Sequence, residues 1–148
     1  MAEGVFRRVA EDQGAMHRFE IDSAGLGDWH AGQAPDNRAQ EAAKTRGADI
    51  SGQCARQVRA EDFERFDFLL AMDRSNHADL LMLAPEEARH KVRFFLDFAT
   101  HMGAKEVPDP FYGGKEGFDL ALDLIEAAAQ GLLAEMLATE PKSAKHGA

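Results

Sequence analysis

The segment FDFLLAMDRSN, from Phe66 to Asn76, decides the fold class. Phe68 to Met72 is an unbroken apolar run, which is typical of a parallel strand that is covered on both faces. The residues after it, RSNHADLLML, have the pattern of a helix, and either Asp73 or Ser75 can cap its first amides. Because a buried strand that leads at once into a helix is the unit of α/β folds, this segment predicts an α/β protein with a parallel sheet.

Helices and short strands alternate along the rest of the chain. FEIDSAG and KVRFFLDF have strand patterns, the second one weaker, and DNRAQEAAKTRG and RAEDFERF have helical patterns. Two more helices are predicted from Met1 to about Gln13 and from about Glu116 to Ala138, although Gly131 weakens the second by roughly 1 kcal/mol. That second helix has an apolar stripe of Phe118, Ala121, Leu122, Ile125, Ala128, Leu132 and Met136. No segment has the composition of a linker, so we expect one α/β domain over residues 1–138 and a disordered tail over residues 139–148.

Composition and charge exclude several classes of protein. The net charge of the 148 residues is −9, which argues against a nucleic-acid surface. The longest apolar stretches are too short to span a bilayer, and the first residues lack the apolar core of a secretory signal. A single cysteine, Cys54, rules out an internal disulfide and suits the reducing cytoplasm, and the six histidines lack the spacing of metal ligands. We therefore expect a cytoplasmic protein with no metal and with no nucleic-acid or membrane partner.

Two loops have unusual compositions. VPDPFYGG, from Val107 to Gly114, holds one carboxylate, Asp109, between two prolines. Asp-Pro is a common turn dipeptide, so these residues alone favour a turn. GLGDWHAGQAP carries Trp29, the only tryptophan. His30 stands where a dinucleotide-binding loop needs its third glycine, so this loop does not match that motif.

Five segments, in this order, resemble the low-molecular-weight protein tyrosine phosphatases: MAEGVFRRV, IDSAGLGDWHAGQAPDNRA, ISGQCARQV, FDFLLAMDRSN and VPDPFYGG. The resemblance extends to about Leu137. It implies a doubly wound parallel sheet of four strands in the order 2-1-3-4, whose first strand ends in a loop C-x5-R-[ST]-P. Met1, Ala2 and Glu3 resemble the residues that follow this loop. We therefore expect the chain to lack the central first strand, the nucleophilic cysteine and the phosphate-binding arginine.

The resemblance also implies a reaction. In this family a cysteine thiolate attacks phosphorus, so the implied activity is hydrolysis of phosphotyrosine or other phosphomonoesters through a cysteinyl-phosphate. Asp109 is then the general acid that protonates the leaving group, and Trp29 and Tyr112 wall the substrate entrance. Supporting roles are implied for three more residues, Ser23, Asp73 and Asn76.

Several of these assignments have structural alternatives. Trp29 and Tyr112 can be packing residues, and Asp73 can cap a helix without any ligand. Ser23 can bond to a neighbouring loop, and Glu3 can either support the site through a hydrogen bond or lie on a solvated helix face.

Cys54 and Arg59 form a C-x4-R pattern, one residue shorter than the loop of the family. Bulky side chains stand where that loop needs small ones, and Glu61 and Asp62 would oppose a thiolate. Cys54 is therefore expected to be a structural or incidental cysteine.

A missing central strand predicts a weak fold. FEIDS and FDFLLAM would lie on either side of a gap, separated by twice a strand spacing of about 4.8 Å. Unpaired backbone groups there would cost about 1–3 kcal/mol each. We therefore expect a chain that is unstable or prone to aggregation and that is inactive by itself.

Three functions remain open. The first is a phosphatase acting on a phosphotyrosine protein, such as a tyrosine kinase, or on a small aryl phosphate. The alternative is a non-catalytic phosphatase-like protein that binds a partner. An arsenate reductase of the same fold ranks lowest, because it needs further cysteines and Cys54 is the only one. The phosphatase chemistry implies no cofactor.

Overall fold

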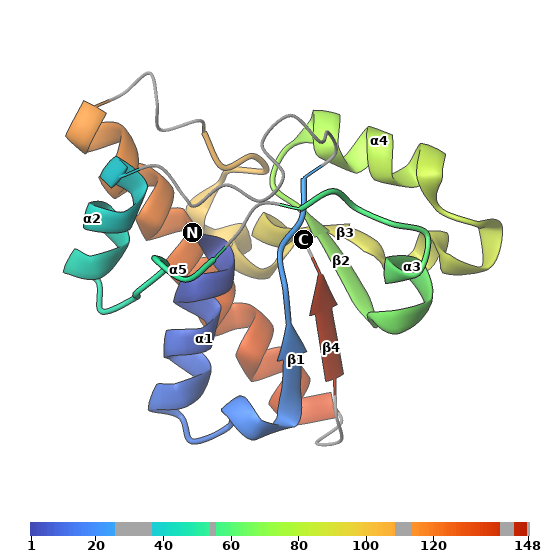
Figure 1. The fold of residues 1–148 in the computed structure, drawn as a ribbon, viewed down its shortest axis with the longest axis horizontal. Helices are drawn as coiled ribbons and strands as arrows, with labels where there is room; N and C mark the ends of the chain where they lie inside the picture. Colours follow the sequence, from blue (N-terminus) through green and yellow to red (C-terminus); the bar gives the residue numbers. More distant parts are fainter. Residues whose placement is uncertain (26–36, 54–55, 109–113, 140–143, 148) are drawn as a thin grey trace.

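A parallel sheet with strand order β1-β4-β2-β3 lies at the centre of the computed structural model, which describes residues 1–25, 37–53, 56–108, 114–139 and 144–147 (Figure 1). The strands are β1 (Phe19–Ile21), β2 (Phe68–Ala71), β3 (Val92–Phe94) and β4 (Ala144–Gly147). Every neighbouring pair of strands runs parallel. The predicted α/β class with parallel strands is therefore confirmed.

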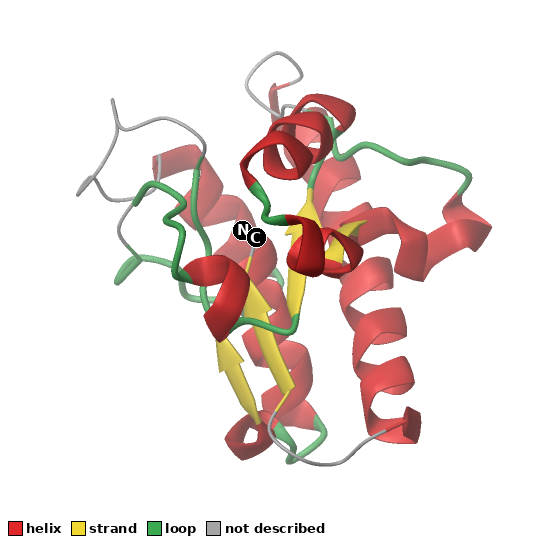
Figure 2. Ribbon diagram, turned by 90° about the vertical axis from the view of Figure 1, so that its right-hand side faces the viewer, coloured by secondary structure: helices red, strands yellow, loops and turns green. Residues whose placement is uncertain are grey.

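The helices form two groups on opposite sides of the sheet (Figure 1). One group is α1 (Ala2–Asp12), α2 (Asn37–Thr45) and α5 (Gly114–Thr139); the other is α3 (Asp62–Arg65) and α4 (Arg74–Leu83). Three 3₁₀ helices complete the described elements: η1 (Met16–Arg18), η2 (Glu86–Lys91) and η3 (Phe95–Met102). Figure 2 shows the strands between the helical layers from a second direction.

The position of β2 between two helical layers explains why its sequence is apolar without interruption. Leu70 packs into the cluster formed with α1 and α5, whereas Leu69 and Ala71 pack into the cluster formed with α3 and α4. Successive strand side chains point to opposite faces, so a strand between two helical layers needs apolar residues at every position. The predicted buried strand is confirmed.

Helix α5 buries the whole of its predicted apolar stripe. Gly131, which the sequence marks only as a weak point of this helix, lies against η3. A Cβ atom at this position would sit 1.9 Å from the carbonyl oxygen of Phe98, far inside van der Waals contact. The close approach of α5 to η3 therefore requires glycine.

The end of the chain differs from the prediction. Residues 144–147, which the sequence predicts as part of a disordered tail, form β4, one of the two inner strands of the sheet. Residues 19–21 pair with 144–146 on one side, and residues 68–69 pair with 146–147 on the other. The physical reason is that the inward edges of β1 and β2 carry backbone groups that need hydrogen-bond partners.

The expected gap between β1 and β2 is therefore wrong. β4 occupies the position between them and pairs with both. The expectation of low stability depends on unpaired backbone groups at the inward edges of β1 and β2. At the positions that pair with β4 these groups have partners. Low stability itself stays a prediction.

Candidate functional site

A cavity of about 390 Å³ lies beyond the carboxyl ends of β1 and β2. Ligands of open α/β sheets bind outside this edge. Its lining includes apolar residues of β2, Leu70 and Ala71. Six other lining residues are called the rim below: Met1, Glu3, Ser23, Gly25, Asp73 and Pro108.

The first turn of α1 borders this cavity. No side chain caps the helix at Met1. Burial lowers the pKa of the Met1 amino group, and the nearby charge of Glu3 opposes that shift. The first amides of a helix attract negative charge, so this end of α1 favours acceptor groups in the cavity.

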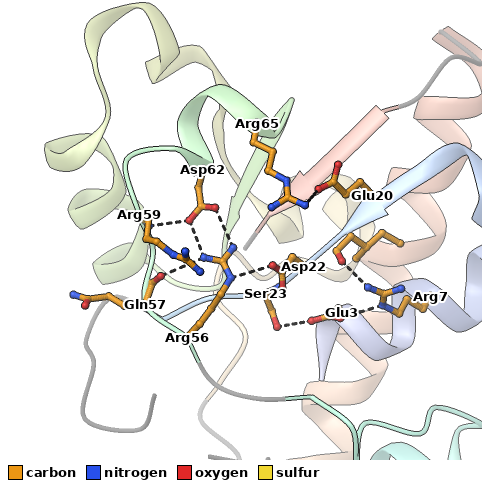
Figure 3. A network of polar contacts seen from close by, with 11 residues as sticks. Glu3, Arg7, Glu20, Asp22, Ser23, Arg56, Gln57, Arg59, Asp62 and Arg65 are labelled. Atoms are coloured by element: carbon orange, nitrogen blue, oxygen red, sulfur yellow. Dashed lines mark hydrogen bonds and ion pairs between the residues drawn. The ribbon is translucent and has the colours of Figure 1, made fainter. Parts of the chain in front are cut away.

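Ser23 connects the end of β1 to α1 (Figure 3). Its hydroxyl donates a hydrogen bond of 2.6 Å to Glu3, so among the described residues it bonds to a helix. The other carboxylate oxygen of Glu3 accepts from Arg7 at 3.0 Å, and Arg7 also donates to the carbonyl oxygen of Ile21 at 2.6 Å. Only 11% of the Glu3 side chain is exposed, which excludes a solvated helix face for this residue and favours the supporting hydrogen bond.

A second polar group, which the sequence analysis missed, lies next to Ser23. Arg56 donates to both carboxylate oxygens of Asp62, at 2.9 and 3.1 Å, and to Asp22 at 3.0 Å. The signal in the sequence is an arginine six residues before an acidic residue that begins a short helix, and this spacing has no meaning without the fold. These contacts hold the loop before α3 against the end of β1 (Figure 3).

Asp62 is a buried carboxylate whose charge is compensated. Burial alone would raise its pKa, but hydrogen bonds from Arg56 and from the Arg59 N–H, together with the charges of these arginines, outweigh burial and lower the pKa. The hydrogen bond with Asp62 is the largest of the causes that raise the pKa of Arg56. Both groups are therefore charged at neutral pH.

Asp73 and Asn76 lie on the opposite side of the cavity. The Asp73 carboxylate accepts a hydrogen bond of 2.7 Å from the N–H of Asn76 and so caps α4. Of the two predicted caps for this helix, Asp73 is confirmed and Ser75 is wrong. Capping accounts for Asp73 without a ligand, and its predicted supporting role stays a prediction.

The segment that leads to Asp109 is attached to the same side. The N–H of Val107 donates to the carbonyl oxygen of Met72 at 2.8 Å, and the N–H of Arg74 donates to Glu106 at 3.3 Å. Pro108, the next residue, lines the cavity. The chain therefore enters the Asp109 segment at the rim of the cavity.

Four residues with a predicted role lie outside the described residues: Trp29, Cys54, Asp109 and Tyr112. Their roles stay predictions. Within the described ranges, no three His, Cys, Asp or Glu residues are grouped so that they could hold a metal ion. No helix in those ranges is both long and apolar enough to cross a membrane.

Comparisons with known proteins agree on one family. The family model described as low molecular weight phosphotyrosine protein phosphatase matches residues 1–143. A putative phosphatase of this kind from Synechocystis is 39% identical over 136 residues, which cover 91% of the chain and 86% of that protein. One from Streptomyces coelicolor is 42% identical over 137 residues, covering 90% and 83%. A crystal structure of a protein tyrosine phosphatase from Entamoeba histolytica has a TM-score of 0.89 at 35% identity, covering 93% of the chain and 87% of that structure.

Proposed function

Because the chain belongs to the low-molecular-weight phosphotyrosine protein phosphatase family, we propose that its residues serve the hydrolysis of phosphotyrosine or another phosphomonoester. The observation that carries this proposal is the family match over residues 1–143. The cavity at the carboxyl edge of the sheet supports it, because Pro108 on its rim is the neighbour of Asp109 in the sequence.

Asp109 is the proposed general acid. A carboxylic acid in this role protonates the departing phenolate or alkoxide and then, as a carboxylate, activates the hydrolytic water. Pro108 and Pro110 restrict the backbone on either side of it. Trp29 and Tyr112 are the proposed walls of the substrate entrance, and a phosphotyrosine protein, such as a tyrosine kinase, is the proposed substrate in the cytoplasm.

The nucleophile is a separate question. The reaction needs a cysteine thiolate, and Cys54 is the only cysteine among the 148 residues. Its spacing to Arg59 is one residue shorter than the family pattern C-x5-R. We therefore propose that a polypeptide of these 148 residues does not turn over phosphate monoesters by itself.

An assay of this polypeptide with p-nitrophenyl phosphate and a phosphotyrosine peptide tests that proposal. The expected result is no release of phosphate above that of Asp109→Asn or Cys54→Ser. Turnover that disappears in Cys54→Ser would contradict it and would make Cys54 the nucleophile.

The role of Asp109 needs a polypeptide that has a nucleophile. A chimera that carries a strand and a loop of the pattern C-x5-R-[ST]-P ahead of Met1 supplies one. In this chimera Asp109→Asn is expected to lower kcat for phosphotyrosine by about a hundredfold or more. The loss should be smaller for p-nitrophenyl phosphate, because nitrophenolate leaves without a proton.

Asp79→Asn is the matched control for that substitution. Asp79 is an exposed carboxylate on α4, so the variant changes the same charge away from the cavity. It should leave kcat for both substrates unchanged. Equal rates for Asp109→Asn and the unsubstituted chimera on phosphotyrosine would overturn the assignment of the acid.

A non-catalytic phosphatase-like binding protein is the second candidate. The observation in its favour is that the 148 residues contain no C-x5-R pattern. It predicts a folded polypeptide that has no turnover and that binds a phosphotyrosine peptide. A titration of the polypeptide with such a peptide, followed by calorimetry, separates this candidate from an inert chain.

A further inference from the structure

Arg56 connects three parts of the molecule that meet at the cavity. Its guanidinium group holds both oxygens of Asp62, at the start of α3, and one oxygen of Asp22, directly after β1 (Figure 3). Only 20% of its side chain and 10% of that of Asp62 are exposed. Two carboxylates therefore share one largely buried positive charge.

The backbone around Arg56 makes a second connection to the same strand end. The N–H of Gly25 donates to the carbonyl oxygen of Arg56 at 2.8 Å, and the N–H of Val58 donates to the carbonyl oxygen of Gly25 at 2.8 Å. The guanidinium group and these two bonds thus hold residues 22–25 against residues 56–58 at both ends of the segment.

The held segment contains two residues of the cavity rim, Ser23 and Gly25. Asp22 accepts from the N–H of Ser23 at 2.8 Å with one oxygen while its other oxygen accepts from Arg56. Ser23 in turn donates to Glu3, another rim residue. The guanidinium group of Arg56 is therefore linked through Asp22 to Ser23, and through Ser23 to Glu3.

A second ion pair, between α3 and β1, has no such connection to the rim residues. Arg65 of α3 pairs with Glu20 of β1, but 58% of the Arg65 side chain is exposed and it has no described contact with residues 22–25. Losing Arg65 removes an exposed pair, whereas losing Arg56 leaves Asp22 and Asp62 without their shared counter-charge.

We propose that Arg56 is a positioning residue that holds the carboxyl end of β1, with Ser23 and Gly25, in place at the rim of the cavity. The description of this cavity as a phosphatase site rests on the proposed function. The role of Arg56 is argued from the contacts between residues 22–25 and 56–62 and not from the family, so the two ideas can fail separately.

Amide hydrogen exchange in the 148-residue polypeptide tests this proposal without any need for turnover. In Arg56→Met the amides of Gly25 and Val58 should exchange at least about tenfold faster, while the amides of α5 keep their protection. Arg56→Lys keeps the charge but not the fork of donors, so it should restore part of the protection. Arg65→Met, the matched control, should leave Gly25 and Val58 unchanged.

Two results would overturn the role of Arg56. One is a loss of protection that is equal at Gly25, Val58 and the amides of α5, because that is a general loss of stability. The other is an equal effect of Arg65→Met on the two rim amides. If Arg56→Met does not fold, Asp22→Asn decides: selective faster exchange at Gly25 and Val58 supports the proposal, and unchanged exchange there refutes it.

Discussion

The two sides of the cavity are built from contacts of different strength. On the first side, residues 22–25 meet residues 56–58 and α3 through a charged network, in which the side chains of Arg56 and Asp62 are 20% and 10% exposed. On the second side, residues 72–76 meet residues 106–108. There the ion pair of Arg74 with Glu106 spans 3.9 Å, and the two side chains are 73% and 47% exposed.

This difference separates a fixed side from an adjustable one. Charge-assisted hydrogen bonds out of water hold geometry firmly, whereas exposed ion pairs contribute little free energy. The contacts of the second side, between residues 72–76 and 106–108, should therefore shift at a smaller cost in free energy than those of the first side.

Removal of β4 should destabilise both sides of the cavity, because β4 joins the strands that carry them. A polypeptide of residues 1–139 leaves the inward edges of β1 and β2 unpaired at five residue positions. Each lost hydrogen bond costs about 1 kcal/mol and each buried unpaired group more, so several kcal/mol are expected. Urea unfolding followed by circular dichroism measures the loss. Equal midpoints for residues 1–139 and 1–148 would mean that β4 contributes nothing.

Asp62→Ala should have the second-largest effect, and it acts on the first side of the cavity. It removes the buried partner of Arg56 and the acceptor of the Arg59 N–H. Breaking a buried charged pair by removing one partner is expected to lower the free energy of unfolding by about 3 kcal/mol. Chemical denaturation measures it, with Asp79→Ala, at an exposed acidic residue on α4, as the control.

Acid should weaken the same side by a smaller amount. The pKa of Asp62 in the folded chain lies below its ordinary value of 3.8, so the unfolded chain takes up the proton first. The stabilisation is present above that value and is lost as the pH falls through the lowered pKa. Unfolding free energies from about pH 5 to about pH 3 should fall more steeply in the unsubstituted chain than in Asp62→Asn. Parallel slopes would contradict the lowered pKa.

The sequence predicts the second side better than the first. The apolar run and the cap at Asp73 are local patterns, so β2 and the start of α4 follow from neighbouring residues. Asp22 lies 34 residues before Arg56, and the six-residue spacing of Arg56 and Asp62 has no meaning without the fold, so no local pattern marks the three as partners. β4 was missed for a related reason: its sequence, AKHG, lacks strand-forming residues, and the pairing needs of β1 and β2 place it.

Asp73→Ala should have a moderate effect on the second side. It removes the side-chain acceptor of the Asn76 N–H and is expected to cost about 1 kcal/mol of unfolding free energy. Ser75→Ala is the control, because Asp73 and not Ser75 caps α4. Thermal unfolding of the two variants compares them directly. A larger loss in Ser75→Ala would mean that the helix is capped differently.

Glu106→Gln should have the smallest effect, and it measures how adjustable the second side is. The amide still accepts from the N–H of Arg74, so only the exposed ion pair at 3.9 Å is lost. Surface pairs of this kind contribute at most about 1 kcal/mol, and salt screens them, so the change should also shrink as the salt concentration rises. A loss as large as that of Asp62→Ala, independent of salt, would mean that the segment before Asp109 is held as firmly as the carboxyl end of β1. The contrast between a fixed and an adjustable side would then be wrong.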